Sequence, residues 1–158
     1  MSMQLGHDAP EFQLKDQYGK EHTLKQYRGQ WVLIYFYPKD DTPGCTKEAC
    51  GMRDNFADFE DGGVVILGIS RDSVESHKKF AEKYNLPFTI LADDQTKAAK
   101  AYDVWGEKTF MGKKHMGIHR MSFLINPEGK IKKIYEKVKP EAHAKEILED
   151  IVMLKSEK

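Results

Sequence analysis

Two uninterrupted apolar runs constrain the fold of this chain more than any other feature. Residues 31–37 read WVLIYFY and residues 64–69 read VVILGI. A strand that is apolar without alternation is buried on both faces, as in the centre of a sheet that helices cover on both sides. Because helical signals fill the segment between the runs, we expect a β-α-β unit with parallel strands and a right-handed crossover.

The helix of this unit is predicted to follow the first strand closely. Thr42 suits the N-cap position and Pro43 the first helical position, while Gly62-Gly63 ends the helix. The side chains expected to form its buried stripe share helical spacing and are Ala49, Met52, Phe56 and Phe59.

The remaining segments predict further elements around this unit. We expect helices at residues 72–84, 96–102 and 140–154, and strands at residues 88–91, 121–125 and 131–135. The last two strands flank Asn-Pro-Glu-Gly, which is typical of a tight turn and predicts a hairpin. Together these elements indicate an α/β fold, with a central mixed sheet flanked by helices, in one domain spanning residues 1–158.

Charge and composition exclude several classes of protein. The 25 Lys and Arg residues balance 25 Asp and Glu residues, so no bulk field favours nucleic acid or an anionic membrane. No apolar run approaches the roughly 20 residues of a membrane helix, and the first residues lack the pattern of a signal peptide. Two cysteines are too few for a secreted disulfide framework. We therefore expect a cytoplasmic protein in a reducing compartment, without nucleic-acid or membrane partners.

Both cysteines lie in the stretch PKDDTPGCTKEAC, which joins the first strand to the helix. If Thr42 is the cap, Cys45 is the third helical residue, where free backbone N–H groups and the helix dipole favour a thiolate. Such surroundings lower a cysteine pKa from about 8.5 into roughly 3.5–7.5. The pattern therefore predicts that Cys45 is a nucleophile.

Cys50 stands five residues further along the same helix. Residues at this spacing have Cα atoms roughly 8.7 Å apart, from the helical rise and radius, whereas a disulfide needs them within about 7 Å. An intact helix therefore forbids a Cys45–Cys50 bond, and forming one requires the first turns to unwind. Two inert core thiols, or a zinc site completed by histidines, are the alternatives, but the spacing matches no usual zinc pattern. We expect no metal and no cofactor.

Three residues of this stretch form the motif P-x-x-x-T-x-x-C, namely Pro38, Thr42 and Cys45. At the end of such a strand, this motif resembles that of the peroxiredoxins, which are thiol-dependent peroxidases. With Cys50 and the later run GIHRMSFLI at residues 117–125, the chain resembles the bacterioferritin comigratory protein (PrxQ) branch. The resemblance implies a thioredoxin-like fold with an N-terminal extension and an insertion around residues 85–119.

The resemblance also implies a role for each matched residue. Cys45 would be the peroxidatic cysteine, Thr42 would hold the peroxide, Pro38 would shield the sulfur and Arg120 would stabilise the thiolate. Cys50 would be the resolving cysteine, forming an intramolecular disulfide that thioredoxin or glutaredoxin reduces. A resolving cysteine in the same chain implies a monomer.

Several other residues have two readings from sequence. Glu48, one turn after Cys45, either orients Arg120 or is an exposed carboxylate that favours the helix dipole. Residues 107–120 form a basic segment that is expected to be a solvated surface loop, the alternative being a loop that raises the potential near Cys45 or docks the reductant. Three neighbouring side chains either line the substrate entrance or pack this insertion: Trp105, Phe110 and Met111. The histidines show no triad or ligand spacing and receive no role.

The function favoured by these observations is reduction of hydrogen peroxide and organic hydroperoxides by thiol chemistry. A thiol–disulfide oxidoreductase is an alternative, but the usual C-x-x-C is missing. A non-catalytic redox sensor using the same disulfide is a second alternative, because sensing and catalysis use the same thiol chemistry.

Overall fold

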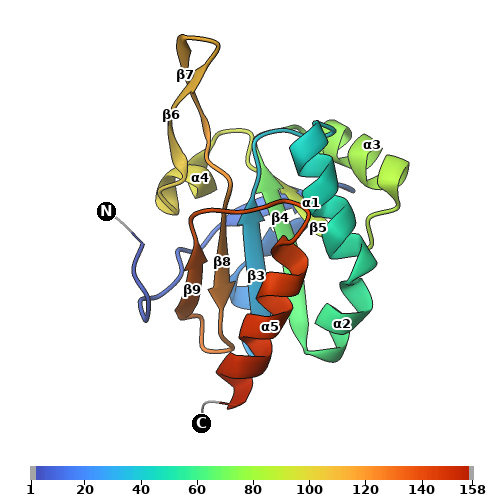
Figure 1. Ribbon diagram of the computed structural model, residues 1–158, viewed down its shortest axis with the longest axis vertical. Helices are drawn as coiled ribbons and strands as arrows, with labels where there is room; N and C mark the ends of the chain where they lie inside the picture. Colours follow the sequence, from blue (N-terminus) through green and yellow to red (C-terminus); the bar gives the residue numbers. More distant parts are fainter. Residues whose placement is uncertain (1–2, 157–158) are drawn as a thin grey trace.

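The computed structural model describes residues 3–156 and shows a mixed sheet covered by helices (Figure 1). The strands are β1 (Gln13–Asp16), β2 (Glu21–Thr23), β3 (Trp31–Phe36), β4 (Val64–Ser70), β5 (Thr89–Ala92), β6 (Trp105–Phe110), β7 (Lys113–Ile118), β8 (Met121–Ile125) and β9 (Ile131–Tyr135). The helices are the 3-10 turn η1 (Lys25–Tyr27), α1 (Pro43–Asp54), α2 (Phe56–Asp61), α3 (Val74–Tyr84), α4 (Lys97–Ala101) and α5 (His143–Ser156). Seven strands form the main sheet in the order β2-β1-β5-β4-β3-β8-β9.

Strand β3 lies at the centre of the fold, as its apolar run predicts. It pairs in parallel with β4 and antiparallel with β8, so the sheet is mixed. Alternate β3 side chains enter two cores. Leu33 and Tyr35 pack with α1, α2 and α5 residues, and Ile34 and Phe36 pack with residues of α4 and β8. Burial on both faces is the reason that the run does not alternate.

The β8–β9 hairpin is confirmed at the predicted strands. The two strands are antiparallel neighbours, and the Gly129 N–H donates to the Asn126 carbonyl at 2.9 Å. Gly129 has φ of 83°, a conformation that glycine adopts without steric cost. The other predicted elements that the structure contains differ from expectation by one to three residues at their ends, the largest being α5, which begins at His143 rather than residue 140.

The helix predicted as continuous between β3 and β4 is wrong in one respect, because it breaks at Asn55 into α1 and α2. The Asn55 side-chain amide donates to the Gly51 carbonyl at 2.8 Å, and the Asn55 N–H donates to the same oxygen. Asparagine side chains compete with backbone groups in this way and favour helix ends. The helix that carries both cysteines is consequently short.

The segment at residues 107–120 is largely exposed, as expected, but the prediction that it forms a loop is wrong, because most of it belongs to the hairpin of β6 and β7. Met111 and Gly112, with φ of 52° and 80°, form the two-residue turn, and positive values at both positions are typical of type I′ turns. Figure 1 shows the hairpin projecting from the end of the sheet at which α1 begins. Its strands are largely exposed and lack the apolar alternation that would reveal them in sequence.

Within residues 3–156, no helix is both long enough and apolar enough to cross a membrane.

Candidate active site

Cys45 lies at the third residue of α1, with only 2% of its surface exposed. Six residues separate the end of β3 from the start of α1, so the thiol sits where the carboxyl end of a central strand meets a helix N-terminus. The Cys45 thiol and the Cys50 thiol are both free, and α1 is intact across both. Cys50 is half-buried, so the two sulfurs occupy different surroundings on one helix.

Arg120 contacts the Cys45 sulfur although the two residues are far apart in the sequence. Its Nη2 donates to Cys45 Sγ at 3.2 Å across 75 residues of sequence. The sheet causes this meeting, because Met121 at the start of β8 pairs directly with Phe36 at the end of β3. The residue before β8 is therefore held beside the residues that follow β3.

Glu48 completes a three-member contact with Arg120 and Cys45. Arg120 Nη1 donates to Glu48 Oε1 at 2.5 Å, and the Glu48 side chain is fully buried. Gly44 makes the approach possible, since a Cβ at this position would lie 3.1 Å from Arg120 Nη2. The exposed-carboxylate reading of Glu48 is wrong, and sequence spacing had no signal for the part that Gly44 plays.

Burial dominates the electrostatics of Glu48. Desolvation raises the pKa of Glu48 to about 7, and the attraction of Arg120 offsets only part of this effect. Burial also opposes the charge on Arg120, but Glu48 and Cys45 outweigh it and raise the Arg120 pKa above its usual range. Arg120 is thus a permanent cation beside the sulfur, whereas Glu48 exchanges a proton near neutral pH.

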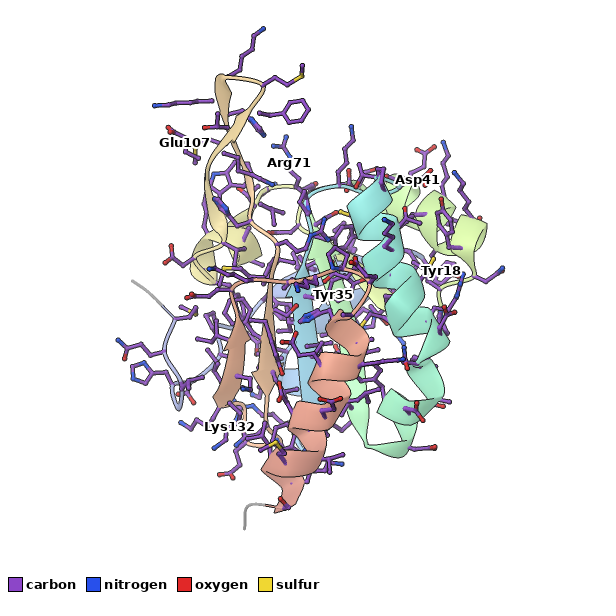
Figure 2. The ribbon with its side chains drawn as sticks, viewed as in Figure 1. Tyr18, Tyr35, Asp41, Arg71, Glu107 and Lys132 are labelled. Atoms are coloured by element: carbon purple, nitrogen blue, oxygen red, sulfur yellow. The ribbon has the colours of Figure 1, made fainter. Side chains whose placement is uncertain are left out.

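Two buried oxygens beside this site lack a hydrogen-bond partner among the described residues, namely Glu48 Oε2 and the Tyr35 hydroxyl. Figure 2 shows Tyr35 in the middle of the molecule, and its side chain belongs to the core cluster that includes α1 residues. Burial raises the pKa of Tyr35 well above its usual value, with further contributions from Glu48 and Cys45. Tyr35 is therefore a neutral neighbour of the site, and an unbonded buried hydroxyl costs free energy.

Thr42 occupies the N-cap position but does not cap α1 with its side chain. Its hydroxyl donates to the Lys39 carbonyl at 2.9 Å, and the helix receives only the Thr42 backbone carbonyl, bonded by the Thr46 N–H. The side-chain cap expected from sequence is therefore wrong. Pro38, between β3 and Thr42, is half-buried.

The segment that carries Arg120 is anchored by a second buried contact, which sequence analysis missed. Ser122 Oγ lies 2.7 Å from His143 Nε2, and His143 Nδ1 lies 3.0 Å from Glu146. Burial lowers the pKa of His143, which favours a neutral ring. The first turn of α5 thus holds β8 two residues past the guanidinium.

The β6–β7 hairpin contributes one side chain near the site. Lys108 Nζ donates to the Ile118 carbonyl at 2.9 Å, and burial, followed by the charge of Arg120, lowers the Lys108 pKa. Phe110 and Met111, by contrast, stand at the hairpin tip with 68% and 86% of their surfaces exposed. These two neither line an entrance nor pack the insertion, whereas Trp105 packs at its base beneath Arg71.

One group of described residues has the composition of a metal site, comprising Asp40, Asp72 and His77, with one potential ligand atom from each within 4.8 Å of the others. Protein donors already use these atoms, because Asp40 Oδ2 accepts from Ser76 and contacts His77 at 2.6 Å. The arrangement is a hydrogen-bonded cluster, and we derive no metal chemistry from it.

The model of the AhpC/TSA family matches residues 5–134. Peroxiredoxin Bcp of Bacillus subtilis is 47% identical over 151 residues, which cover 96% of each chain. The chain therefore belongs to the AhpC/TSA family.

Solved structures place it more narrowly. The bacterioferritin comigratory protein of Xanthomonas campestris, described for its alkyl peroxide reduction activity, has 38% identity and a TM-score of 0.86, covering 90% of this chain and 91% of that one. A cysteine-to-serine variant of PrxQ from Xylella fastidiosa has 34% identity and a TM-score of 0.92, covering 98% and 99%. The resemblance to the Bcp/PrxQ peroxiredoxins is confirmed, and with it a thioredoxin-like fold and thiol-dependent peroxidase chemistry.

Proposed function

We propose that this chain reduces hydrogen peroxide and organic hydroperoxides through Cys45. The observation that carries the proposal is the contact of Arg120 with the buried Cys45 sulfur at a helix N-terminus. A cation and a helix start together favour a thiolate and stabilise negative charge that develops nearby. The alkyl peroxide activity described for the Xanthomonas campestris relative supports the organic substrates.

In the first step the Cys45 thiolate attacks the terminal oxygen of the hydroperoxide. An S–O bond forms, the O–O bond breaks, and the departing alkoxide or hydroxide takes a proton to leave as alcohol or water. Sulfur is oxidised to sulfenic acid and the peroxide is reduced. Arg120 stabilises the charge on the leaving oxygen, Thr42 orients the peroxide through its hydroxyl, and Pro38 shields the sulfur from water.

Glu48 acts on this step through Arg120. The buried 2.5 Å contact orients the guanidinium so that its other nitrogen meets Cys45. Burial raises the pKa of Glu48 to about 7, and its protonation removes the negative charge that otherwise compensates Arg120 beside the sulfur.

In the second step the Cys50 thiol attacks the sulfur of the sulfenic acid. A disulfide forms and water leaves, which prevents further oxidation to sulfinic acid. The distance argument requires the first turns of α1 to unwind before this bond can form. The break at Asn55 leaves a helix of only 12 residues to be disrupted.

The reductant completes the cycle by thiol–disulfide exchange. We assign this role to thioredoxin, with glutaredoxin as the alternative, and place the protein in the cytoplasm as a single-domain monomer. Two thiols in one chain support the assignment as a monomer, because no second subunit is needed to form the disulfide.

Coupled oxidation of NADPH by thioredoxin reductase and thioredoxin tests the proposal. Wild type is expected to turn over with peroxide, Cys45→Ser to be inactive, and Cys50→Ser to consume about one peroxide per chain without recycling. Near-normal turnover of Cys45→Ser would overturn the proposal.

The same protein samples separate the other functions. Activity only on protein disulfides would indicate an oxidoreductase, and oxidation without turnover would indicate a sensor. Mass spectrometry of the peroxide-treated wild type should show a Cys45–Cys50 peptide, and only intermolecular disulfides would contradict local unwinding.

A further inference from the structure

A buried polar cluster fixes the loop between β3 and α1, residues 37–42, and the proposed chemistry does not use this cluster. We define this cluster as Tyr37, Asp40, Ser76 and His77. His77 is fully buried and Asp40 is 8% exposed, although both are charged or polar residues in an apolar surrounding. Buried groups of this kind are expensive unless every hydrogen bond is made.

Hydrogen counting defines the state of the His77 ring. Its Nε2 lies 2.9 Å from the Leu91 carbonyl, which only accepts, so Nε2 carries a hydrogen. Its Nδ1 lies 2.6 Å from Asp40 Oδ2, and a second hydrogen must lie between them. The ring therefore has an acceptor at each nitrogen.

Two more donors point at the same carboxyl group. The Tyr37 hydroxyl donates to Asp40 Oδ1 at 2.5 Å, and the Ser76 hydroxyl donates to Oδ2 at 2.8 Å. Burial and Asp40 raise the Tyr37 pKa well above its usual value, so Tyr37 remains a donor. The side chains of Tyr37, Ser76 and His77 therefore all make hydrogen bonds to the Asp40 carboxyl group.

The backbone of Asp40 is fixed as well as its side chain. Its N–H donates to Asp72 Oδ2 at 2.8 Å, and this oxygen also accepts from the Ser70 hydroxyl at 2.6 Å. Thr42 follows two residues after Asp40, and Cys45 follows three residues after Thr42. The cluster therefore fixes the backbone two residues before Thr42 and five residues before Cys45.

We infer that His77, acting through Asp40, is a positioning residue for the peroxide step. This inference rests on the proposed function of Cys45. Helix α3 supplies the histidine and the β3–α1 loop supplies the carboxyl group, so the pair ties the two elements where Thr42 must meet the substrate. Loss of one partner would leave a buried polar group without its hydrogen bond, which is destabilising.

The anchor also limits how far α1 opens during disulfide formation. Unwinding releases residues from Cys45 onward, while the loop before Thr42 keeps its buried hydrogen bonds. After reduction the helix re-forms from a loop whose position has not changed, so Cys45 returns to its contact with Arg120.

The test measures two reactions of Cys45 in a Cys50→Ser background, in which resolution is blocked. Stopped-flow kinetics give the rate constant with hydrogen peroxide, and iodoacetamide alkylation gives the general reactivity of the thiolate. Alkylation does not need the peroxide to be oriented, so a misplaced loop should slow peroxide selectively. Because a 1 Å misplacement can cost on the order of 100-fold in rate, His77→Gln and Asp40→Asn are each expected to lose about 10-fold or more with peroxide and about two-fold or less with iodoacetamide.

Two further variants serve as controls. Asp41→Asn removes the neighbouring but exposed carboxylate that pairs with Lys83 at 2.8 Å, and it should change neither rate, because exposed pairs contribute little. The double variant Asp40→Asn/His77→Gln should be no slower than either single variant, because each single variant already loses the contact between the two side chains.

Any of three results would overturn the inference. The folded single variants could keep the wild-type rate with peroxide, or their rates with peroxide and with iodoacetamide could fall by the same factor. The loss of peroxide rate in the double variant could also equal the product of the losses in the two single variants. Should those variants not fold, Ser76→Ala removes one donor to Asp40 and keeps the contact between Asp40 and His77. It should show the same selective loss at smaller size, and an unchanged peroxide rate would count against the anchor. Cys45→Ser separates the two claims. Activity in that variant would disprove the proposed function of Cys45, whereas an unchanged peroxide rate in His77→Gln would disprove only the positioning role of His77.

Discussion

Gly51→Ala should slow disulfide formation without affecting the reaction with peroxide. Gly51 lies inside α1 directly after Cys50, and a Cβ there would meet only the Pro140 carbonyl, at 3.8 Å, within 4 Å. This is an ordinary contact, so alanine fits without displacement. An alanine in place of glycine stabilises a helix interior by ~0.8–1.0 kcal/mol.

That gain opposes the unwinding on which the Cys45–Cys50 bond depends. A difference of about 1 kcal/mol changes an equilibrium or a rate about five-fold. The open form of α1 should therefore become about five times rarer, and the disulfide should form about five times more slowly. The peroxide step uses the intact helix and should keep its rate.

Quenched-flow mass spectrometry can follow sulfenic acid, disulfide and sulfinic acid in the same sample. We expect the fraction of chains lost to sulfinic acid at high peroxide to rise about five-fold in Gly51→Ala, because slower resolution leaves sulfenic acid exposed for longer.

A pair of variants at the exposed Lys47 provides the matched control. Lys47→Gly should resolve about four to five times faster than Lys47→Ala, because the pair differs only in helix propensity and has the same charge. A Gly51→Ala protein with a higher Tm but an unchanged resolution rate would refute the reasoning, because opening of α1 would then not precede the bond.

Three further predictions concern the site itself. Arg120→Ala should slow the reaction of Cys45 with hydrogen peroxide in stopped-flow kinetics, because the cation 3.2 Å from the sulfur is lost, and an unchanged rate constant would contradict its role. Glu48 has its pKa raised from 4.5 to about 7 in the folded chain, so the folded state binds more protons and the free energy of unfolding falls as pH rises from about 4.5 to about 7. Glu48→Gln should remove a decline of about 3 kcal/mol, measured by urea unfolding at pH 5 and pH 8, and an unchanged pH slope would exclude Glu48 as its source. Tyr35→Phe should raise the Tm, because it deletes an unbonded buried hydroxyl worth about 1 kcal/mol or more, whereas a lower Tm would show that the hydroxyl has a partner.

The main sheet was largely readable from the sequence. Strands buried on both faces need continuous apolar runs, and residues 31–37 and 64–69 are such runs. The hairpin of β6 and β7 escaped prediction because its exposed strands carry no such pattern, and only the turn at Met111 and Gly112 has a characteristic conformation. The break of the helix at Asn55 depends on a single side-chain hydrogen bond that composition does not reveal.

The candidate site divides in the same way. A cysteine three residues after a cap position has a local physical meaning, and so does a second cysteine five residues later, because both follow from helix geometry. Arg120 was named by resemblance, since an arginine before a strand is usually a solvated charge. The pairing of β8 with β3 is what brings its guanidinium to the sulfur.

Local sequence was enough to predict a cysteine at a helix start and a second thiol that the intact helix holds out of reach. These properties are local, because they depend on residues within two turns of one another. The charges that surround the first cysteine follow instead from the packing of distant segments. Arg120, Glu48 and the Asp40–His77 pair meet across 37 to 75 residues of chain, and such contacts depend on strand pairing and burial.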